Sequence, residues 1–202
     1  MKRFGMKSFM CSILVVISYL SCTLLSYFHY PLPYSPGENW LSDLGNRALN
    51  PTGAIFYNTG IVLTAFWLLL FFLSLSVLKA EEKKIQNLMV LLMQSIGILG
   101  CGSMALSAFF TIANPGLHSL LSGVLYIGIG TAFVFSAAAL RYDPRFPKWL
   151  LVLGILTALF DLLTSVFFNT VPVFEWVTVS LFLTYVLLLG ASMICLENKP
   201  VM

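Results

Sequence analysis

The chain has 202 residues, of which 59% are hydrophobic and only 9% are charged. Soluble proteins contain about 45 to 50% apolar and about 25% charged residues, and a chain this short leaves a large share of its surface exposed. The composition therefore excludes a water-soluble globular protein. The 11 Lys and Arg against 8 Asp and Glu are scattered along the chain, which excludes the concentrated basic surface of a nucleic-acid-binding protein.

Six apolar segments are long enough to cross a bilayer as helices, for which about 20 residues are needed. We predict spans at residues 8–28, 54–78, 88–112, 117–140, 149–168 and 176–196. None of these segments contains Lys or Arg, and none shows the ten-residue alternation of a membrane β-barrel. The sequence therefore predicts an all-α integral membrane protein, in which residues 1–202 form a single six-transmembrane-helix bundle.

Basic residues predict the orientation, because cytoplasmic loops collect Lys and Arg. Ten of the 11 fall at the two ends of the chain and in the loops after the second and fourth spans, and only Arg47 falls on the other side. Both termini are therefore predicted to be cytoplasmic in a cell membrane. Residues 29–53 are then predicted to lie outside.

The external loop contains the signals of a short helix over residues 36–44. Ser35 is a candidate cap, Pro36 takes the first helical position, and Gly45 is the stop signal. Trp40, Leu41 and Leu44 would share one face, which predicts an interfacial helix. Two alternatives remain open: the helix plugs the top of the bundle, or it covers a site.

Small residues predict close packing between the third and fourth spans. They are Gly97, Gly100, Gly102, Ser103 and Ser107 in the third span and Ser119, Gly123, Gly128 and Gly130 in the fourth. Such patterns more often serve packing within one chain than dimerisation, so the sequence predicts no particular oligomeric state.

Asp161 is the only ionisable residue deep inside a predicted span. A charge at that depth costs on the order of 2 to 3 kcal/mol, so the carboxyl should be protonated or partnered. Thr157 and Ser165 lie one turn away on either side. The polar stripe is a candidate functional site, and an interhelical hydrogen bond is the structural alternative.

Polar side chains gather in the outer half of the predicted bundle, whereas the inner half is nearly free of them. Ser122 and Tyr126 follow His118 at four-residue steps, on one helical face. This asymmetry predicts an outward-facing polar pocket. We take its candidate ligand-binding residues to be His29, Asn39, Trp40, Asp43, Arg47, Asn58, His118, Tyr126, Asp161 and Glu175, with Glu38 and Asn169 nearby. No metal site or cofactor is predicted, because nothing in the spacing of the two histidines resembles a ligand set.

Four segments carry a family resemblance: PYSPGENWLSDLG (residues 33–45), IFYNTGIVL (55–63), FFTIANPGLH (109–118) and the Glu175-Trp176 pair. They resemble the prokaryotic membrane family named domain of unknown function 998, which is related to the six-span group of FRAG, DRAM and Sfk proteins. The family pattern falls on Ser42, Asp43, Leu44, Gly45, Asn58, His118 and Glu175. The resemblance implies the same topology and, through eukaryotic relatives linked to lipid remodelling and membrane organisation, a function that involves lipids.

The sequence favours a protein that binds a membrane lipid headgroup or another amphiphile, with Arg47 placed to meet a phosphate. An enzyme is the first alternative, with His118 as general base, Asp43 or Glu175 orienting it, and Ser42 as nucleophile. A transporter dependent on Asp161 is the second alternative, and a purely structural membrane subunit is the third.

Overall fold

The computed structural model describes residues 4–111, 114–167 and 170–197, and within them it has six long α-helices. All six are long and apolar enough to cross a membrane. The chain is therefore a multi-pass membrane protein, as predicted. The helices are α1 (Phe4–Phe28), α2 (Ala54–Ser74), α3 (Lys84–Ser107), α4 (Pro115–Leu140), α5 (Lys148–Phe167) and α6 (Pro172–Glu197), with 3₁₀ helices η1 (Leu41–Gly45) and η2 (Leu75–Leu78).

The limits of α3 differ most from the predicted span, which was residues 88–112. The helix begins at Lys84 because the side chain of Asn87 binds both the N–H and the carbonyl of Ala80, which ties the preceding turn. It ends at Ser107, before the turn in which Pro115 starts α4. The predicted limits of this helix followed from apolar composition, whereas its observed limits are determined by the residues of the turns on either side. Phe168, the predicted end of the fifth span, lies outside the described residues.

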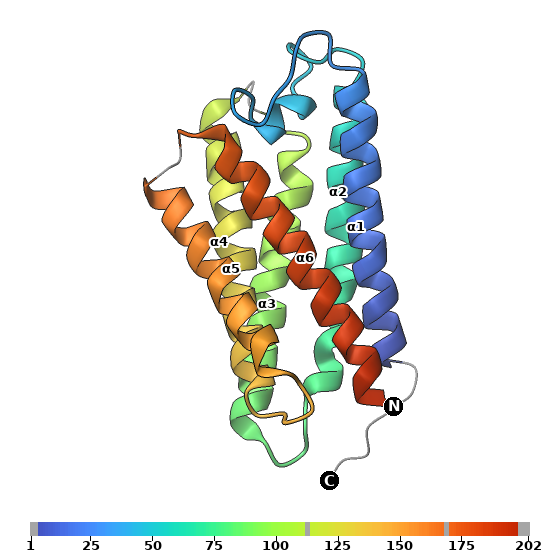
Figure 1. Ribbon diagram of the computed structural model, residues 1–202, viewed down its shortest axis with the longest axis vertical. Coiled ribbons are helices and arrows are strands. Elements are labelled where there is room, and N and C mark those ends of the chain that lie inside the picture. The colour runs from blue at the N-terminus through green and yellow to red at the C-terminus, as the bar shows by residue number, and fades with distance from the viewer. Residues whose placement is uncertain (1–3, 112–113, 168–169, 198–202) are drawn as a thin grey trace.

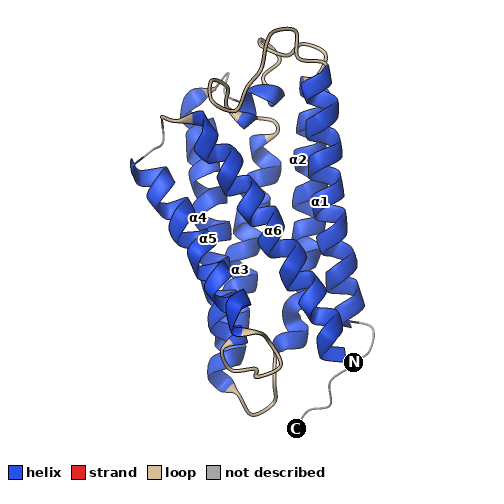
Figure 2. Ribbon diagram, in the orientation of Figure 1, coloured by secondary structure: helices blue, strands red, loops and turns tan. Residues whose placement is uncertain are grey.

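The helices form a ring in chain order, in which each packs against its neighbours and α6 closes on α1. Residues 29–53 cover one end of the ring, which we call the loop end (Figures 1 and 2). The start of α1, the end of α6 and the α2–α3 and α4–α5 turns lie at the other end, which we call the terminal end.

Large apolar side chains occupy both the interior and the outer surface of the ring. Phe71, Phe133 and Tyr185 are fully buried between helices. Leu99 and Leu156 are 67% and 57% exposed on the outside. An outer surface of this kind is stable only against hydrocarbon, which agrees with six membrane spans.

Glycines allow α3 and α4 to approach closely, as predicted. A Cβ added at Gly128 would lie 3.4 Å from the Cα of Gly100, so the two backbones are in contact there. The hydroxyl of Ser103 donates to the carbonyl of Leu121 at 2.7 Å. Gly102 and Gly123 take no part, because a Cβ at either would meet open space.

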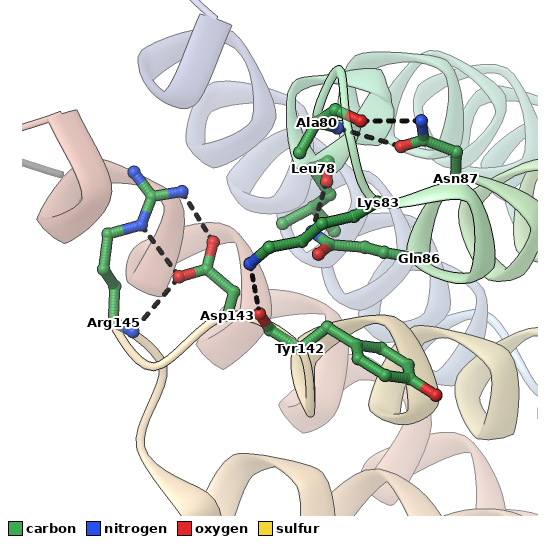
Figure 3. A network of polar contacts seen from close by, with 8 residues as sticks. All are labelled: Leu78, Ala80, Lys83, Gln86, Asn87, Tyr142, Asp143 and Arg145. Carbon is green, nitrogen blue, oxygen red and sulfur yellow. Dashed lines mark hydrogen bonds and ion pairs between the residues drawn. The ribbon is translucent and has the colours of Figure 1, made fainter. Parts of the chain in front are cut away.

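Polar contacts fix the two turns of the terminal end to one another (Figure 3). Lys83 Nζ donates to the carbonyl of Tyr142 at 2.7 Å, across the two turns. Arg145 donates to both oxygens of Asp143 at 2.8 and 2.6 Å. Burial acts to raise the pKa of Asp143, but the hydrogen bonds and charge of Arg145 outweigh it and hold that pKa below its usual value.

Candidate functional site

The predicted loop helix is shorter than expected. One turn forms after Ser35, whose carbonyl accepts the N–H of Asn39 at 2.8 Å. The backbone is extended at Trp40, with ψ at 143°, and the 3₁₀ helix η1 begins only at Leu41. The reason is a tertiary contact: the first N–H groups of η1 bind a side chain of α6 in place of Ser35.

That side chain is Glu175, in the first turn of α6. Its Oε2 accepts the N–H of Leu41 at 2.7 Å and that of Ser42 at 3.3 Å. Its Oε1 accepts the hydroxyl of Tyr126 at 3.3 Å. Glu175 therefore caps η1 from a distant segment, because a carboxylate suits the free N–H groups at a helix start.

The end of η1 is also fixed by hydrogen bonds from side chains. Asn58 Nδ2 donates to the carbonyl of Gly45 at 2.9 Å, and Asn50 Nδ2 donates to that of Leu44 at 3.1 Å. Leu44 and Asp43 are 0% and 8% exposed. The short helix therefore fills the loop end of the ring and does not lie on its surface.

Asp43 is folded back onto the backbone. Its Oδ2 accepts the N–H of Trp40 at 3.0 Å. Burial raises the pKa of Asp43 above its usual value, and this N–H and the nearby imidazole of His118 oppose the rise.

A cavity of about 90 Å³ lies beneath η1, between α1, α2, α3, α4 and α6. We call it the loop-end cavity. Its polar lining comes from η1 and from helix ends near it: Ser42, Asn58, Ser107, Thr111, His118, Ser122 and Glu175. Its apolar lining lies deeper and includes Leu68, Ile129, Phe133, Phe182 and Val186. At 1.5 Å per residue, Leu68 is about 15 Å below Asn58 on α2, so the cavity grades from polar to apolar along the helices.

One polar group in the deeper part of the cavity has no partner. Thr64 is 2% exposed, and its hydroxyl makes no hydrogen bond with any described residue. Buried hydroxyls are normally hydrogen-bonded, so each exception calls for a physical reason. A polar atom of a bound molecule would supply the missing partner.

The structure brings together four of the ten predicted ligand-binding residues. Asn58, His118, Tyr126 and Glu175 line the loop-end cavity, as does Ser42. Three other predicted residues, Asp43, Asn39 and Trp40, hold the loop without lining the cavity. The carbonyl of Asn39 accepts a hydrogen bond from Trp176 Nε1. The carbonyl of Trp40 accepts one from the hydroxyl of Tyr34.

The other predicted residues lie elsewhere. His29 and Arg47 are exposed and do not line the cavity. The Nδ1 of His29 makes a hydrogen bond with the carbonyl of Leu25. Asn169 lies outside the described residues.

The polar lining residues missing from the prediction include Tyr19, Tyr57, Thr64 and Thr111. Tyr57 and Thr64 are seven residues apart, so they share one face of α2 with Asn58 beside them. That spacing was the available signal. A hydroxyl inside an apolar run is otherwise indistinguishable from a packing residue.

The ring of His118 is oriented by a backbone carbonyl and not by one of the predicted catalytic residues. A carbonyl can only accept, so the contact of Nδ1 with the Phe110 carbonyl at 3.1 Å places the proton on Nδ1. Among the hydrogen bonds between described residues, none joins His118 to Ser42, Asp43 or Glu175. The enzyme alternative stays a prediction.

Asp161 belongs to a different place. It lines a cavity of about 120 Å³ between α4 and α5, with Gly130, Ala158 and Leu162 among its neighbours. Asp161 is 3% exposed, and its Oδ1 has no hydrogen-bond partner among the described residues. Asp161 is therefore not part of the loop-end cavity, and neither the transporter alternative nor a structural role follows from its contacts.

The terminal half of the bundle is more polar than the sequence suggested. The hydroxyl of Ser74 donates to that of Ser8 at 2.8 Å, and Gln94 Nε2 donates to the Phe72 carbonyl at 3.0 Å. Ser136 and Tyr185 share a hydrogen bond of 2.6 Å. These groups join helices to one another and line neither of the two cavities.

Comparisons of the chain with family models, with curated proteins and with solved structures find no match. The family resemblance noted in the sequence therefore stays a prediction. Among the described residues, no group of three or more His, Cys, Asp or Glu side chains is arranged to hold a metal ion.

Proposed function

We propose that this membrane protein binds the polar group of a small amphiphile or lipid in the loop-end cavity. The observation that carries the proposal is the graded lining, polar at η1 and apolar below, with the Thr64 hydroxyl left without a partner. Binding sites for small molecules are mostly apolar, with a few convergent polar groups that fix orientation. The loop-end cavity has this composition.

The side of the membrane follows from the basic residues. Described Lys and Arg residues gather in the turns of the terminal end, at Lys79, Lys83, Lys84, Arg141 and Arg145. Cytoplasmic loops carry such an excess. The terminal end is then cytoplasmic, and the cavity lies in the half of the bundle nearer the outer leaflet, where lipid headgroups and small amphiphiles are available.

The cavity volume limits what enters. Its volume of about 90 Å³ is smaller than the roughly 150 Å³ of an engineered apolar cavity that holds one benzene molecule. The enclosed part of the occupant is therefore a compact polar group with a short apolar neighbour.

The test compares two variants that add the same side chain to α4. Ser122→Phe places a ring in the cavity, and Ser119→Phe places it on the exposed face of the same helix. Each protein is purified gently, and retained amphiphiles are identified by mass spectrometry. The proposal expects a retained molecule in the wild type and in Ser119→Phe but not in Ser122→Phe. A wild type that retains nothing specific, or two variants that retain the same molecule equally, would contradict it.

A further inference from the structure

The charges around the loop-end cavity are all of one formal sign. Among the described residues that line it, Glu175 is the only acidic one, and none is Lys or Arg. Asp43 follows the lining residue Ser42 in η1 and is itself buried. Arg47, the basic residue nearest in sequence, is exposed and absent from the lining. His118 is the one described lining residue whose side chain could become positive.

Glu175 forms no ion pair with any cationic side chain in the part of the chain that the structure describes. The one ion pair between described residues joins Asp143 and Arg145 at the terminal end. The carboxylate of Glu175 is held instead by two backbone N–H groups on Oε2 and by one long bond from Tyr126 on Oε1. A carboxylate offers about four acceptor positions, so Oε1 can still accept a hydrogen bond from a molecule in the cavity.

Aromatic rings make up much of the remaining wall. Tyr19, Tyr57, Tyr126, Phe133 and Phe182 all line the cavity. Phe182 packs against Phe133 and Tyr126, with ring centroids 5.1 and 6.2 Å apart. Ring faces attract cations within about 6 Å of the centroid, most strongly where water is excluded.

We propose that the polar group bound in this cavity is cationic, a primary amine or a quaternary ammonium held by Glu175 beside the ring of Tyr126. The inference rests on the proposed function and specifies its ligand class. A phosphate or carboxylate would approach Glu175 and Asp43 with no Lys or Arg to balance it, which opposes binding. This proposal replaces the expectation from the sequence that Arg47 contacts a phosphate: the contact proposed here is between Glu175 and an amine.

The experiment uses three ligands that differ only in the polar group: hexylamine, hexanol and hexanoate. Their binding to the full-length protein in nanodiscs is measured by calorimetry. We expect hexylamine to bind at least about tenfold more tightly than the other two, because a charge-assisted hydrogen bond replaces a neutral one. The preference should disappear in Glu175→Gln, which keeps the acceptor for η1, and should persist in Glu38→Gln, which makes the same change on the exposed loop.

A second arm distinguishes a lipid headgroup from a free amine. Nanodiscs with equal amounts of phosphatidylethanolamine and phosphatidylglycerol of identical chains are used, and the lipid retained on the released protein is counted by native mass spectrometry. Enrichment of phosphatidylethanolamine identifies the headgroup as the source. Hexylamine binding without that enrichment identifies a free amine, and either result supports the inference.

The results distinguish failure of the cationic ligand class from failure of the proposed function. If hexanol or hexanoate binds as well as hexylamine, the cationic class is overturned while binding of an amphiphile stands. If none of the three ligands and neither lipid binds, the proposed function fails as well. A preference for hexylamine that survives in folded Glu175→Gln would overturn the role of Glu175. The wild-type ligand series decides the class even if that variant does not fold.

Discussion

The carboxylate of Glu175 and the backbone N–H of Leu41, 134 residues apart in the chain, are joined by a hydrogen bond of 2.7 Å. This contact fixes the start of η1 to the start of α6. It also sets the roof of the loop-end cavity, because Ser42 and Glu175 both line it. The residue proposed to bind a ligand therefore also holds the loop above the site.

Removal of this acceptor should weaken the fold. We expect Glu175→Ala to lower the free energy of unfolding by about 1 to 3 kcal/mol, because the N–H groups of Leu41 and Ser42 lose their partner. Glu175→Gln keeps an acceptor oxygen and should lose less than half as much. Thermal unfolding in a mild detergent measures both. Equal stability of Glu175→Ala and the wild type would show that the cap contributes nothing.

The contrast between helices and site shows what the sequence could predict. A membrane span needs about 20 apolar residues whatever its neighbours are, so all six spans could be found from composition. The capping of η1 could not, because a contact between Glu175 and Leu41 leaves no local pattern. Ser35, Pro36 and Gly45 predicted a longer helix, and the tertiary contact prevailed over that local signal.

The same distinction applies to the cavity. Tyr126 was predicted because it follows His118 at helical spacing, and both residues line the cavity. Arg47 was included only for its charge and its side of the membrane, and the structure leaves it exposed. Side-chain type indicates which residues can act, but only packing determines which of them meet.

Asp161 should behave differently from Glu175 when it is truncated. Its Oδ1 is buried without a hydrogen-bond partner, next to a space between α4 and α5 that is already present. We therefore expect Asp161→Ala to change the free energy of unfolding by less than about 1 kcal/mol, or to increase it, because an unsatisfied buried group is removed. The same unfolding assay applies. A loss as large as that of Glu175→Ala would show that the carboxyl joins α5 to another helix.

The Asp143–Arg145 pair predicts a pH dependence at the terminal end. The pKa of Asp143 is lowered from 3.8 in the folded protein, so the folded state binds this proton less tightly than the unfolded chain does. The stabilisation is complete above about pH 4 and is lost as pH falls through the lowered pKa.

Asp143→Asn should therefore lower the free energy of unfolding at pH 7 by about 1 to 2 kcal/mol and should flatten its decline in acid. Unfolding measured between pH 7 and pH 3 tests this. Glu82→Gln, a change at an exposed acid in the other turn, is the matched control and should leave the pH profile unchanged. A profile of Asp143→Asn that runs parallel to the wild type would contradict the prediction.

Gly154 should tolerate no side chain, in contrast to Gly102. A Cβ at Gly154 would lie 2.6 Å from the hydroxyl oxygen of Tyr185, whose ring is fully buried and whose hydroxyl is bonded to Ser136. Gly154→Ala therefore forces that ring to move and to lose its hydrogen bond, at about 1 to 3 kcal/mol. Gly102→Ala meets open space and should leave stability unchanged or raise it by up to about 1 kcal/mol, because Ala is the better helix former. Thermal unfolding of the two variants side by side should show a loss of stability for Gly154→Ala alone if α5 and α6 pack through Tyr185. Equal effects would show that this contact does not hold the helices together.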